Sequence, residues 1–285
     1  MAPPPYIQIQ NVTKRFGKKI ILNDLNLDIP FGEVTGIIGA SGSGKTTLLN
    51  LLIGFMKPDK GTIFFQSRDI FKDMKNVSTI FGFGAQACSF YFDLSVEENL
   101  IYFGKLYGLK SKDIKKRIPE LLELIELKDA RRTLGKQLST GMKRRLDIAC
   151  ALIHEPKVLI LDEPTEELDP ILRKGLINTI RRIRNSGKTV IVTSHLLNEI
   201  ERLCDDVAIL NEGRIVAFDT PANLKKKYSK IDLDDVFEVI IKQSRLKKQQ
   251  PKVSVEKEPE KKKTLLDAFL WGEKDKTQKE ELKNK

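Results

Sequence analysis

GASGSGKT, residues 39–46, is the stretch that decides the fold of this chain. It fills the pattern G-x-x-x-x-G-K-S/T, and its flanks have the composition that this pattern requires. Residues 34–38, VTGII, form a short apolar run with β-branched side chains, which is typical of a buried strand. Residues 46–52, TTLLNLL, read as the start of a helix with an apolar face. Strand, glycine-rich loop and helix in this order predict a phosphate-binding loop.

The chemistry of this loop suits the phosphates of a nucleoside triphosphate. Glycines let successive backbone N–H groups turn inward around a phosphate, and the N-terminus of the following helix adds a partial positive charge. Lys45 can reach the β- and γ-phosphates, and the hydroxyl of Thr46 can bind Mg²⁺. The alternative is a glycine-rich turn that precedes a lysine by chance, and the flanking strand and helix argue against it. The residues expected to bind the nucleotide here are Gly39, Ala40, Ser41, Gly42, Ser43, Gly44, Lys45, Thr46 and Thr47.

The bulk composition is that of an ordinary globular chain. At 285 residues it suits about two domains, and 40% hydrophobic with 31% charged residues can bury a sizeable core. No run approaches the ~18 consecutive apolar residues of a membrane span, and the N-terminus lacks the pattern of a signal peptide. Three cysteines without a C-x-x-C pair favour reduced thiols in the cytosol, and two histidines nearly exclude a histidine metal site. The net charge of +11 would suit nucleic acid, an anionic membrane surface or a lysine-rich proteome, so it identifies no partner.

Two segments near the N-terminus alternate in the manner of strands. Residues 6–12 and 25–29 predict a small antiparallel sheet beside the nucleotide core. Phe16 is expected in the loop between them, where it could stack on an adenine ring or simply pack as an aromatic. Farther along, residues 77–83 read as another apolar strand. Gln86 follows that strand, and a glutamine at such a place carries no signal by itself.

The next part of the chain has a helical pattern. Residues 95–98, SVEE, form a capping box, in which a serine hydroxyl and a glutamate carboxylate satisfy backbone donors. Apolar residues at helical spacing follow it. Residues 138–142, LSTGM, open another helix, whose capped N-terminus could also bind an anion. Residues 90–153 are therefore predicted to be a mainly helical insertion between strands of the core.

Two later strands end in polar side chains. Residues 158–161, VLIL, are continuously apolar, as a parallel strand buried on both faces should be, and Asp162 and Glu163 follow them. Residues 189–193, TVIVT, form the next such strand, which His195 follows. The carboxyl ends of parallel strands form the edge at which open α/β sheets bind ligands. Asp162 is therefore expected to hold Mg²⁺, and Glu163 to polarise the attacking water.

In this order the motifs resemble those of the ATP-binding cassette (ABC) superfamily. The resemblance spans residues 6–222 and rests on the combination, since several of the motifs are weak individually. It implies an α/β fold: a P-loop NTPase core with a mainly parallel sheet, an N-terminal antiparallel β subdomain and an inserted helical subdomain. The stretches that carry it are residues 39–46, Gln86, 138–142, 161–165, 168–170 and 194–195.

The resemblance also implies roles for single residues. Phe16 would stack on the adenine, and Gln86 would touch the magnesium ion and sense a partner. Asp169 would join two nucleotide sites at the seam of a dimer, and the catalytic pair would be Glu163 with His195, which faces the γ-phosphate. The signature residues that would contact the ATP bound by the opposite subunit are Ser139, Thr140 and Gly141.

Within the superfamily, residues 138–146, LSTGMKRRL, resemble the type-two export branch. That branch serves exporters of drugs, sodium, lipids or polysaccharides. Residues 233–237 resemble the short helix that commonly closes these cassettes. Two residues depart from the family pattern. Glu167 stands where glycine is usual, which adds bulk and negative charge near the dimer seam, and Cys150 replaces a usual arginine.

By this resemblance the chain binds ATP and Mg²⁺ and works as a sandwich of two cassettes. Each ATP would lie between Lys45 of one subunit and Ser139 of the other, and hydrolysis would release the closed dimer. The second cassette would be a copy of this chain or a sister subunit, and separate membrane permease chains would complete the transporter. We expect a peripheral location on the cytoplasmic face of the cell membrane, and no nucleic-acid partner. The predicted parts are a cassette at 6–230, a closing helix at 231–241 and a charged tail at 242–285.

Two other classes of protein compete with an ABC transporter ATPase as explanations of this sequence. A soluble cassette ATPase that acts on ribosomes or nucleic acid would suit the positive charge, but such proteins usually carry two cassettes or a long coiled coil. A regulatory module that binds ATP without turnover is less compatible with an intact Glu163 and His195. The tail has the composition of a disordered linker. A short helix is possible at residues 264–271, and it could dock on a membrane or a partner.

Overall fold

The computed structural model describes residues 5–249. The chain divides into two compact units, residues 1–244 and 245–285. Both sheets belong to the first unit, and of the second unit the structure describes only the backbone of residues 245–249, the end of the last helix. The predicted helix at 264–271, like the rest of the tail beyond residue 249, lies outside the described residues. No helix within residues 5–249 is long and apolar enough to cross a membrane.

The core is a six-stranded sheet in the order β10-β9-β3-β8-β7-β6. All neighbouring pairs are parallel except β9 with β10, which confirms the predicted fold class. β3 and β7 are buried on both faces, which explains their nearly continuous apolar sequences. The strands are β3 Val34–Ile38, β6 Phe81–Gly84, β7 Val158–Asp162, β8 Thr189–Ser194, β9 Asp206–Asn211 and β10 Arg214–Asp219.

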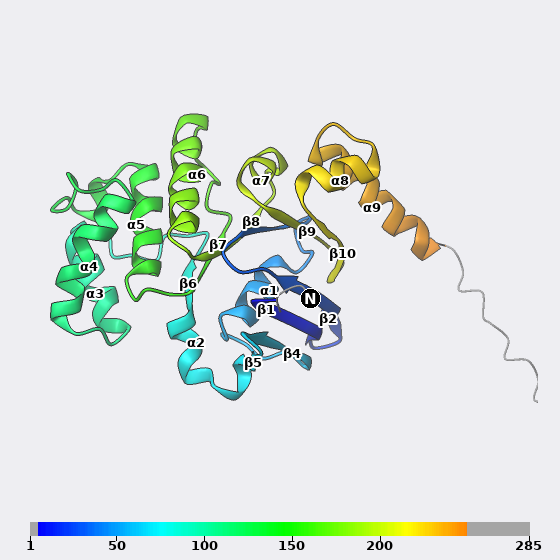
Figure 1. The fold of residues 1–285 in the computed structure, drawn as a ribbon, viewed down its shortest axis with the longest axis horizontal. Coiled ribbons are helices and arrows are strands. Elements are labelled where there is room, and N and C mark those ends of the chain that lie inside the picture. Colours follow the sequence, from blue (N-terminus) through cyan, green and yellow to red (C-terminus); the bar gives the residue numbers. More distant parts are fainter. Residues whose placement is uncertain (1–4, 250–285) are drawn as a thin grey trace, which may run out of the picture. The chain divides into compact units, whose positions relative to one another are not determined.

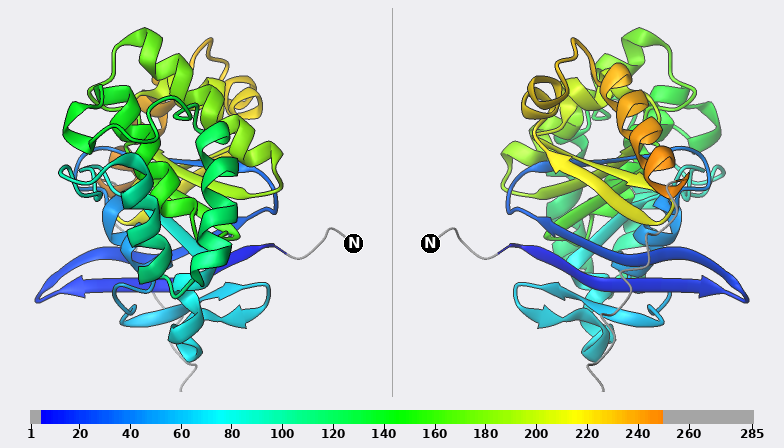
Figure 2. Two further views of the ribbon diagram at one scale, coloured as in Figure 1. Left: turned by 90° about the vertical axis from the view of Figure 1, so that its left-hand side faces the viewer. Right: turned by 90° about the vertical axis from the view of Figure 1, so that its right-hand side faces the viewer.

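A second sheet, in the order β2-β1-β4-β5, is antiparallel throughout. Its β1–β2 hairpin is longer than predicted, so Phe16 is the last residue of β1 and not part of a loop. Cross-strand pairing continues to Phe16 opposite Lys19, which leaves two residues for the turn. Figure 2 shows the hairpin, in dark blue, as a layer apart from the larger sheet. The strands are β1 Ile7–Phe16, β2 Lys19–Ile29, β4 Lys60–Phe65 and β5 Arg68–Asp69.

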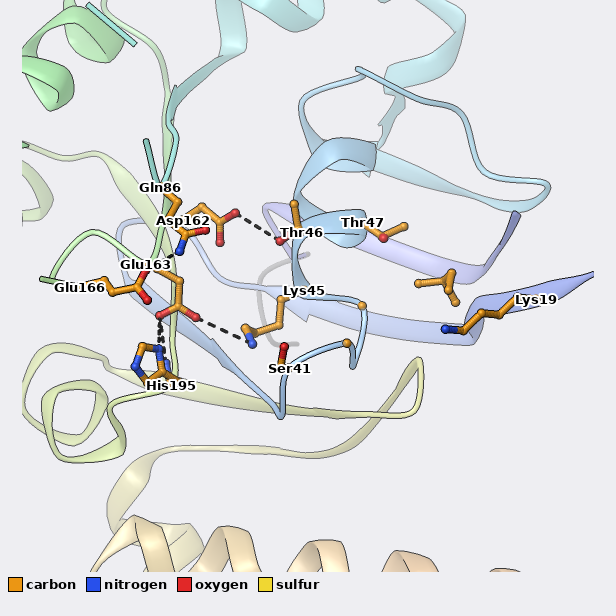
Figure 3. A pocket seen from close by; sticks show the side chains of 13 residues that line it. Lys19, Ser41, Lys45, Thr46, Thr47, Gln86, Asp162, Glu163, Glu166 and His195 are labelled. Atoms are coloured by element: carbon orange, nitrogen blue, oxygen red, sulfur yellow. Dashed lines mark hydrogen bonds and ion pairs between the residues drawn. The ribbon is translucent and has the colours of Figure 1, made fainter. Parts of the chain in front are cut away.

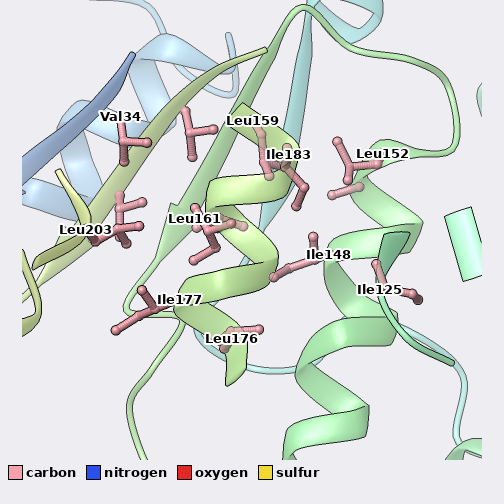
Figure 4. Close-up of a cluster of buried hydrophobic side chains, with 14 of the residues drawn as sticks. Val34, Ile125, Ile148, Leu152, Leu159, Leu161, Leu176, Ile177, Ile183 and Leu203 are labelled. Carbon is pink, nitrogen blue, oxygen red and sulfur yellow. The ribbon is translucent and has the colours of Figure 1, made fainter. Parts of the chain in front are cut away.

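The larger sheet has a hydrophobic core on each face. α1 and the smaller sheet lie on one face, and α5, α6 and α7 lie on the other (Figure 1). Side chains of β7 alternate between the two cores, because successive residues of a strand point to opposite faces. Val158 and Ile160 belong to the first core, whereas Leu159 and Leu161 pack against the helices (Figure 4). The helices on the two faces of the larger sheet are α1 Lys45–Leu52, α5 Thr140–Leu152, α6 Pro170–Asn185 and α7 Leu197–Leu203. Helix α8, Pro221–Tyr228, follows β10 in the chain.

Three α-helices stand between β6 and β7 in the chain: α3 Val96–Leu106, α4 Ser111–Leu124 and α5. The capping box that was predicted at the start of α3 is present. The Ser95 hydroxyl accepts from the Glu98 N–H at 3.2 Å, and the Glu98 carboxylate accepts from the Ser95 N–H at 2.8 Å. A short 3₁₀ helix, Gly135–Gln137, precedes α5.

The strand predicted at residues 77–83 is wrong over its first half. Met74–Ile80 forms helix α2, after the 3₁₀ turn Ile70–Lys72, and β6 begins only at Phe81. The β-branched residues of this segment favour a strand by propensity. Val77, however, is buried on the helix beside the chain at Gly54, and such packing overrides a weak local preference.

The closing helix runs past its predicted end. α9 spans Leu233–Gln249, whereas the sequence indicated an end at residue 241. Leu233 and Val236 are buried in the core, which anchors the first turns. Residues 242–249 contain no glycine or proline and consist mainly of good helix formers, so nothing stops the helix there.

Asn99 of α3 joins this helix to the segment that leads into it. Its side chain is fully buried; the amide donates to the carbonyl oxygens of Tyr91, Leu94 and Ser95 and accepts from the Tyr91 N–H. Asn99→Ala should lower the free energy of unfolding by about 2–3 kcal/mol, because these buried groups lose their partners. Urea unfolding followed by circular dichroism measures the change. Lys105→Ala, on the exposed side of α3, is the matched control, and an equal effect of the two variants would contradict the role of Asn99.

Candidate nucleotide site

The phosphate-binding loop connects β3 to α1 (Figure 3). Gly42 and Gly44 have φ values of +78° and +113°, which residues with side chains rarely adopt. A Cβ atom on Gly44 would lie 2.7 Å from Cδ2 of Leu22, so a side chain there would clash with β2. These glycines let the loop turn directly into the N-terminus of α1, whose first N–H groups have no partners within the helix. Such an end is a ready anion site.

A cavity of about 500 Å³ opens beside this loop. It lies at the carboxyl ends of β6, β7 and β8, and β2 forms another part of its wall. Most of the residues predicted from the sequence meet here. The predicted residues that line the cavity are Ser41, Gly42, Gly44, Lys45, Thr46, Thr47, Gln86, Asp162, Glu163 and His195.

Lys45 and Thr46, the first two residues of α1, face the two carboxylates. The Lys45 ammonium donates to the carbonyl oxygen of Gly39 at 2.8 Å and lies 3.8 Å from Oε1 of Glu163. The Thr46 hydroxyl donates to Oδ2 of Asp162 at 3.3 Å. Figure 3 shows these side chains pointing into one space in front of the loop. The loop and the end of β7 therefore form two walls of one site.

Thr193, near the end of β8, holds both acidic residues in place. Its hydroxyl donates to Oδ1 of Asp162 at 2.5 Å and accepts from the backbone N–H of Glu163 at 3.0 Å. The register of the sheet sets Asp162 directly opposite Thr193. One hydroxyl thus orients the carboxylate of the first acid and the backbone of the second.

Glu163 is buried and has a left-handed backbone conformation, with φ of +49°. For a residue other than glycine this costs about 1–2 kcal/mol, and it turns the chain sharply at the end of the strand. The Glu163 carboxylate accepts from the backbone N–H of His195 at 3.1 Å and lies 2.9 Å from its ring Nδ1. Because a carboxylate only accepts, this arrangement fits a proton on Nδ1.

The oxygen atoms in the cavity fit a magnesium ion. Mg²⁺ prefers hard oxygen ligands, and it is often held by one or two protein groups together with substrate phosphates. Thr46 and Asp162 present a hydroxyl and a carboxylate within hydrogen-bond distance of each other. Gln86, whose side chain carries an amide oxygen, also lines this cavity. The sequence patterns predict Thr46 and Asp162 for the metal, and the family resemblance adds Gln86.

Helix α5 holds the segment that carries Gln86. Arg144 is buried and donates from Nη1 to the backbone oxygen of Gln86. Asp147, one turn later, accepts from the backbone N–H of Ser89 at 2.8 Å and from its hydroxyl at 2.6 Å. Burial raises the pKa of Asp147, although the bonds from Ser89 and the charge of Arg144 act in the opposite direction. The segment is thus tied to α5 at both ends.

Other predicted residues lie outside the cavity lining. Ser139 caps α5 by accepting from the Met142 N–H, and Asp169 caps α6 by accepting from two backbone N–H groups. Phe16 is half-exposed, and the Lys14 ammonium lies 5.7 Å from its ring centroid. The roles of these residues in binding nucleotide stay predictions. Within residues 5–249, the predicted residues that do not line the cavity are Phe16, Gly39, Ala40, Ser43, Ser139, Thr140, Gly141 and Asp169.

Four residues of the site are absent from the sequence-based prediction. Lys19 and Ile21 line the cavity from β2, and Glu166 lines it from the turn after β7. Thr193 lies behind the acids. Glu166 and Thr193 stand close in sequence to predicted residues at the same sheet edge, which is the signal that could have found them. No local pattern relates β2 to the phosphate loop.

A phosphate-binding loop, a carboxylate pair at the end of the neighbouring strand and a histidine beside it define a P-loop nucleoside triphosphatase. The family model described as ABC transporter matches residues 22–166. This chain belongs to the ABC transporter family. It is an ATP-binding and ATP-hydrolysing transporter subunit.

Relatives and solved structures agree with this assignment. The chain is 36% identical to the linearmycin resistance ATP-binding protein LnrL of Bacillus subtilis, over 76% of this chain and 70% of the relative. It is also 36% identical to the Nod factor export ATP-binding protein I of Burkholderia lata, over 82% and 77%. The structure of cbiO1 from Clostridium perfringens, part of the ABC transporter complex cbiONQ, superposes with a TM-score of 0.74 at 27% identity, covering 86% of this chain and 98% of that one. A dimeric ATP-binding cassette in a post-hydrolysis state, bound to ADP and Pi, has a TM-score of 0.66 at 28% identity, over 75% and 98%.

Proposed function

We propose that this chain is the ATPase subunit of an exporter and acts on membrane permease subunits carried by separate chains. Two relatives support the proposal that the transporter is an exporter: one is named for Nod factor export and one for resistance to linearmycin. The proposed location is the cytoplasmic face of the cell membrane, at the permease. The proposed parts are the cassette at 6–230, with 90–153 as its helical insertion, and the closing helix α9, which begins at Leu233.

The position of the signature carries the proposal that two cassettes act together. Ser139, Thr140 and Gly141 form the start of α5, and among the described residues they do not line the cavity of their own chain. Ser139 and Thr140 are exposed and Gly141 is buried, so the first two residues of this helix N-terminus can meet a phosphate presented by another subunit. The second cassette would be a copy of this chain or a sister subunit. The dimeric relative bound to ADP and Pi supports this arrangement.

The geometry of the cavity supports in-line attack of water on the γ-phosphate. Lys45 exchanges its contacts with Gly39 and Glu163 for phosphate oxygens. Glu163 then takes a proton from the attacking water while the bond from the γ-phosphorus to the ADP oxygen breaks, and His195 keeps the carboxylate oriented. A magnesium ion held by Thr46, Asp162 and Gln86 would neutralise phosphate charge.

A tagged Glu163→Gln chain tests this function. Purified with ATP from mildly solubilised native cells, it should retain its transport partner because hydrolysis no longer opens the complex. Mass spectrometry should find a polytopic membrane protein in near-equal amount. The control is the same chain that also carries Lys45→Ala, from which ATP-dependent retention should be lost. Recovery of ribosomal proteins or nucleic acid, with no membrane protein, would overturn the exporter proposal. It would favour a soluble cassette ATPase that acts on ribosomes or nucleic acid.

A further inference from the structure

Glu166 is a third acidic residue in the cavity, and the reaction described above does not use it. It belongs to the turn after β7, where its backbone N–H donates to the carbonyl oxygen of Glu163 at 3.2 Å. Its half-buried side chain accepts a hydrogen bond from Nε2 of Gln86 (Figure 3). The two residues are 80 positions apart in the chain, so this contact joins the end of β7 to the segment after β6.

The backbone of Gln86 is held in place by hydrogen bonds, so only the conformation of its side chain can vary. Arg144 holds the Gln86 carbonyl from α5, and Asp147 holds Ser89 three residues later. The Gln86 side chain itself is exposed on the cavity wall. An exposed amide samples several rotamers unless a partner selects one. Glu166 is that partner.

The chemistry of the contact determines which end of the amide stays free. A carboxylate has only acceptor atoms, so the NH₂ group of Gln86 must face Glu166. The amide oxygen then points away from Glu166 and is available to another donor or to a cation. Magnesium takes oxygen ligands and not amide nitrogen. Residues that orient a metal ligand by hydrogen bonding commonly change metal affinity when they are replaced.

We propose that Glu166 is a positioning residue, which fixes the orientation of the Gln86 amide so that its oxygen faces the magnesium of Mg–ATP. This rests on the proposed function, in which Gln86 binds that ion. The rival explanation is that Glu166 acts only through its negative charge. Glu167, the next residue, provides the control for charge: its side chain is exposed, and within residues 5–249 it is not part of the cavity lining.

The test measures binding of the non-hydrolysed analogue AMP-PNP to the full chain by calorimetry, with and without excess Mg²⁺. The readout is the dissociation constant without Mg²⁺ divided by the dissociation constant with Mg²⁺. A general structural defect would weaken both affinities and leave this ratio unchanged. Glu166→Gln keeps the size but lets the two amides pair in either orientation, and it should lower the ratio by roughly tenfold. Glu167→Gln makes the same charge change and should keep the wild-type ratio.

Gln86→Ala should lower the ratio to a similar extent, and adding Glu166→Gln to it should have no further effect. An additive effect of the two changes, or equal effects of Glu166→Gln and Glu167→Gln, would overturn the positioning role. A wild-type ratio for Gln86→Ala would show that Gln86 does not bind the metal, and it would overturn the positioning role of Glu166. It would not affect the binding of ATP at the phosphate loop. Failure of the wild-type chain to bind AMP-PNP under either condition would overturn the proposed function itself.

Discussion

Glu163→Gln should lower the rate of ATP hydrolysis by about 10²–10⁴-fold, the usual contribution of a general base. The glutamine keeps the size of the side chain and its place beside His195 and Lys45, but it cannot accept a proton from water. ATP should still bind, so the closed state should accumulate. Phosphate release measures the rate, and gel filtration with light scattering should show an ATP-dependent dimer.

Two controls separate loss of chemistry from loss of structure. Without ATP the Glu163→Gln chain should elute from gel filtration like the wild-type chain. Its midpoint temperature of thermal unfolding should change no more than that of a chain with a single surface substitution. An ATP-bound monomer would argue against the two-cassette arrangement for the isolated chain. Wild-type turnover would show that Glu163 is not the base, and the activation of water would then need another residue of the cavity.

Lys45→Ala should weaken ATP binding by about 10–100-fold, because a charge-assisted hydrogen bond contributes about 1.5–3 kcal/mol. Alanine also leaves Glu163 without its nearest cation in the cavity, at 3.8 Å in this structure, so like-charge repulsion of the phosphates rises. Equilibrium binding of a fluorescent ATP analogue measures the effect.

Lys19→Ala is the matched control for Lys45→Ala. Lys19 lines the same cavity from β2, but its side chain is exposed, so its loss should weaken binding by no more than about fivefold. Similar losses in the two variants would mean that the general positive charge of the cavity binds ATP, and not the specific position of Lys45 at the start of α1.

The sequence predicts those parts of the site that depend on local order. Lys45 follows from one continuous strand–loop–helix pattern. Asp162, Glu163 and His195 follow from a simple geometric rule, since parallel strands bring their carboxyl ends to one edge. Nothing beyond the order of elements is needed for these predictions, and the structure places all four side chains in one cavity.

The contacts that join distant segments could not be predicted in this way. The hydrogen bond between Gln86 and Glu166 depends on how β6 and β7 pair, and on a turn whose shape the residues alone do not reveal. The contribution of β2 depends on how the smaller sheet lies against the loop. The β-branched residues of α2 favour a strand by propensity, and burial of Val77 on the helix overrides that preference.

The hydroxyl of Thr193 links catalytic competence to the folding of the central sheet. Since that hydroxyl contacts both Asp162 and Glu163, the acids reach their working positions only when β8 is paired with β7 in the correct register. A slip of one residue would turn Thr193 to the opposite face and free both acids together. A chain in which β7 and β8 are not paired in this register would therefore lack the arrangement of Asp162 and Glu163 on which hydrolysis depends.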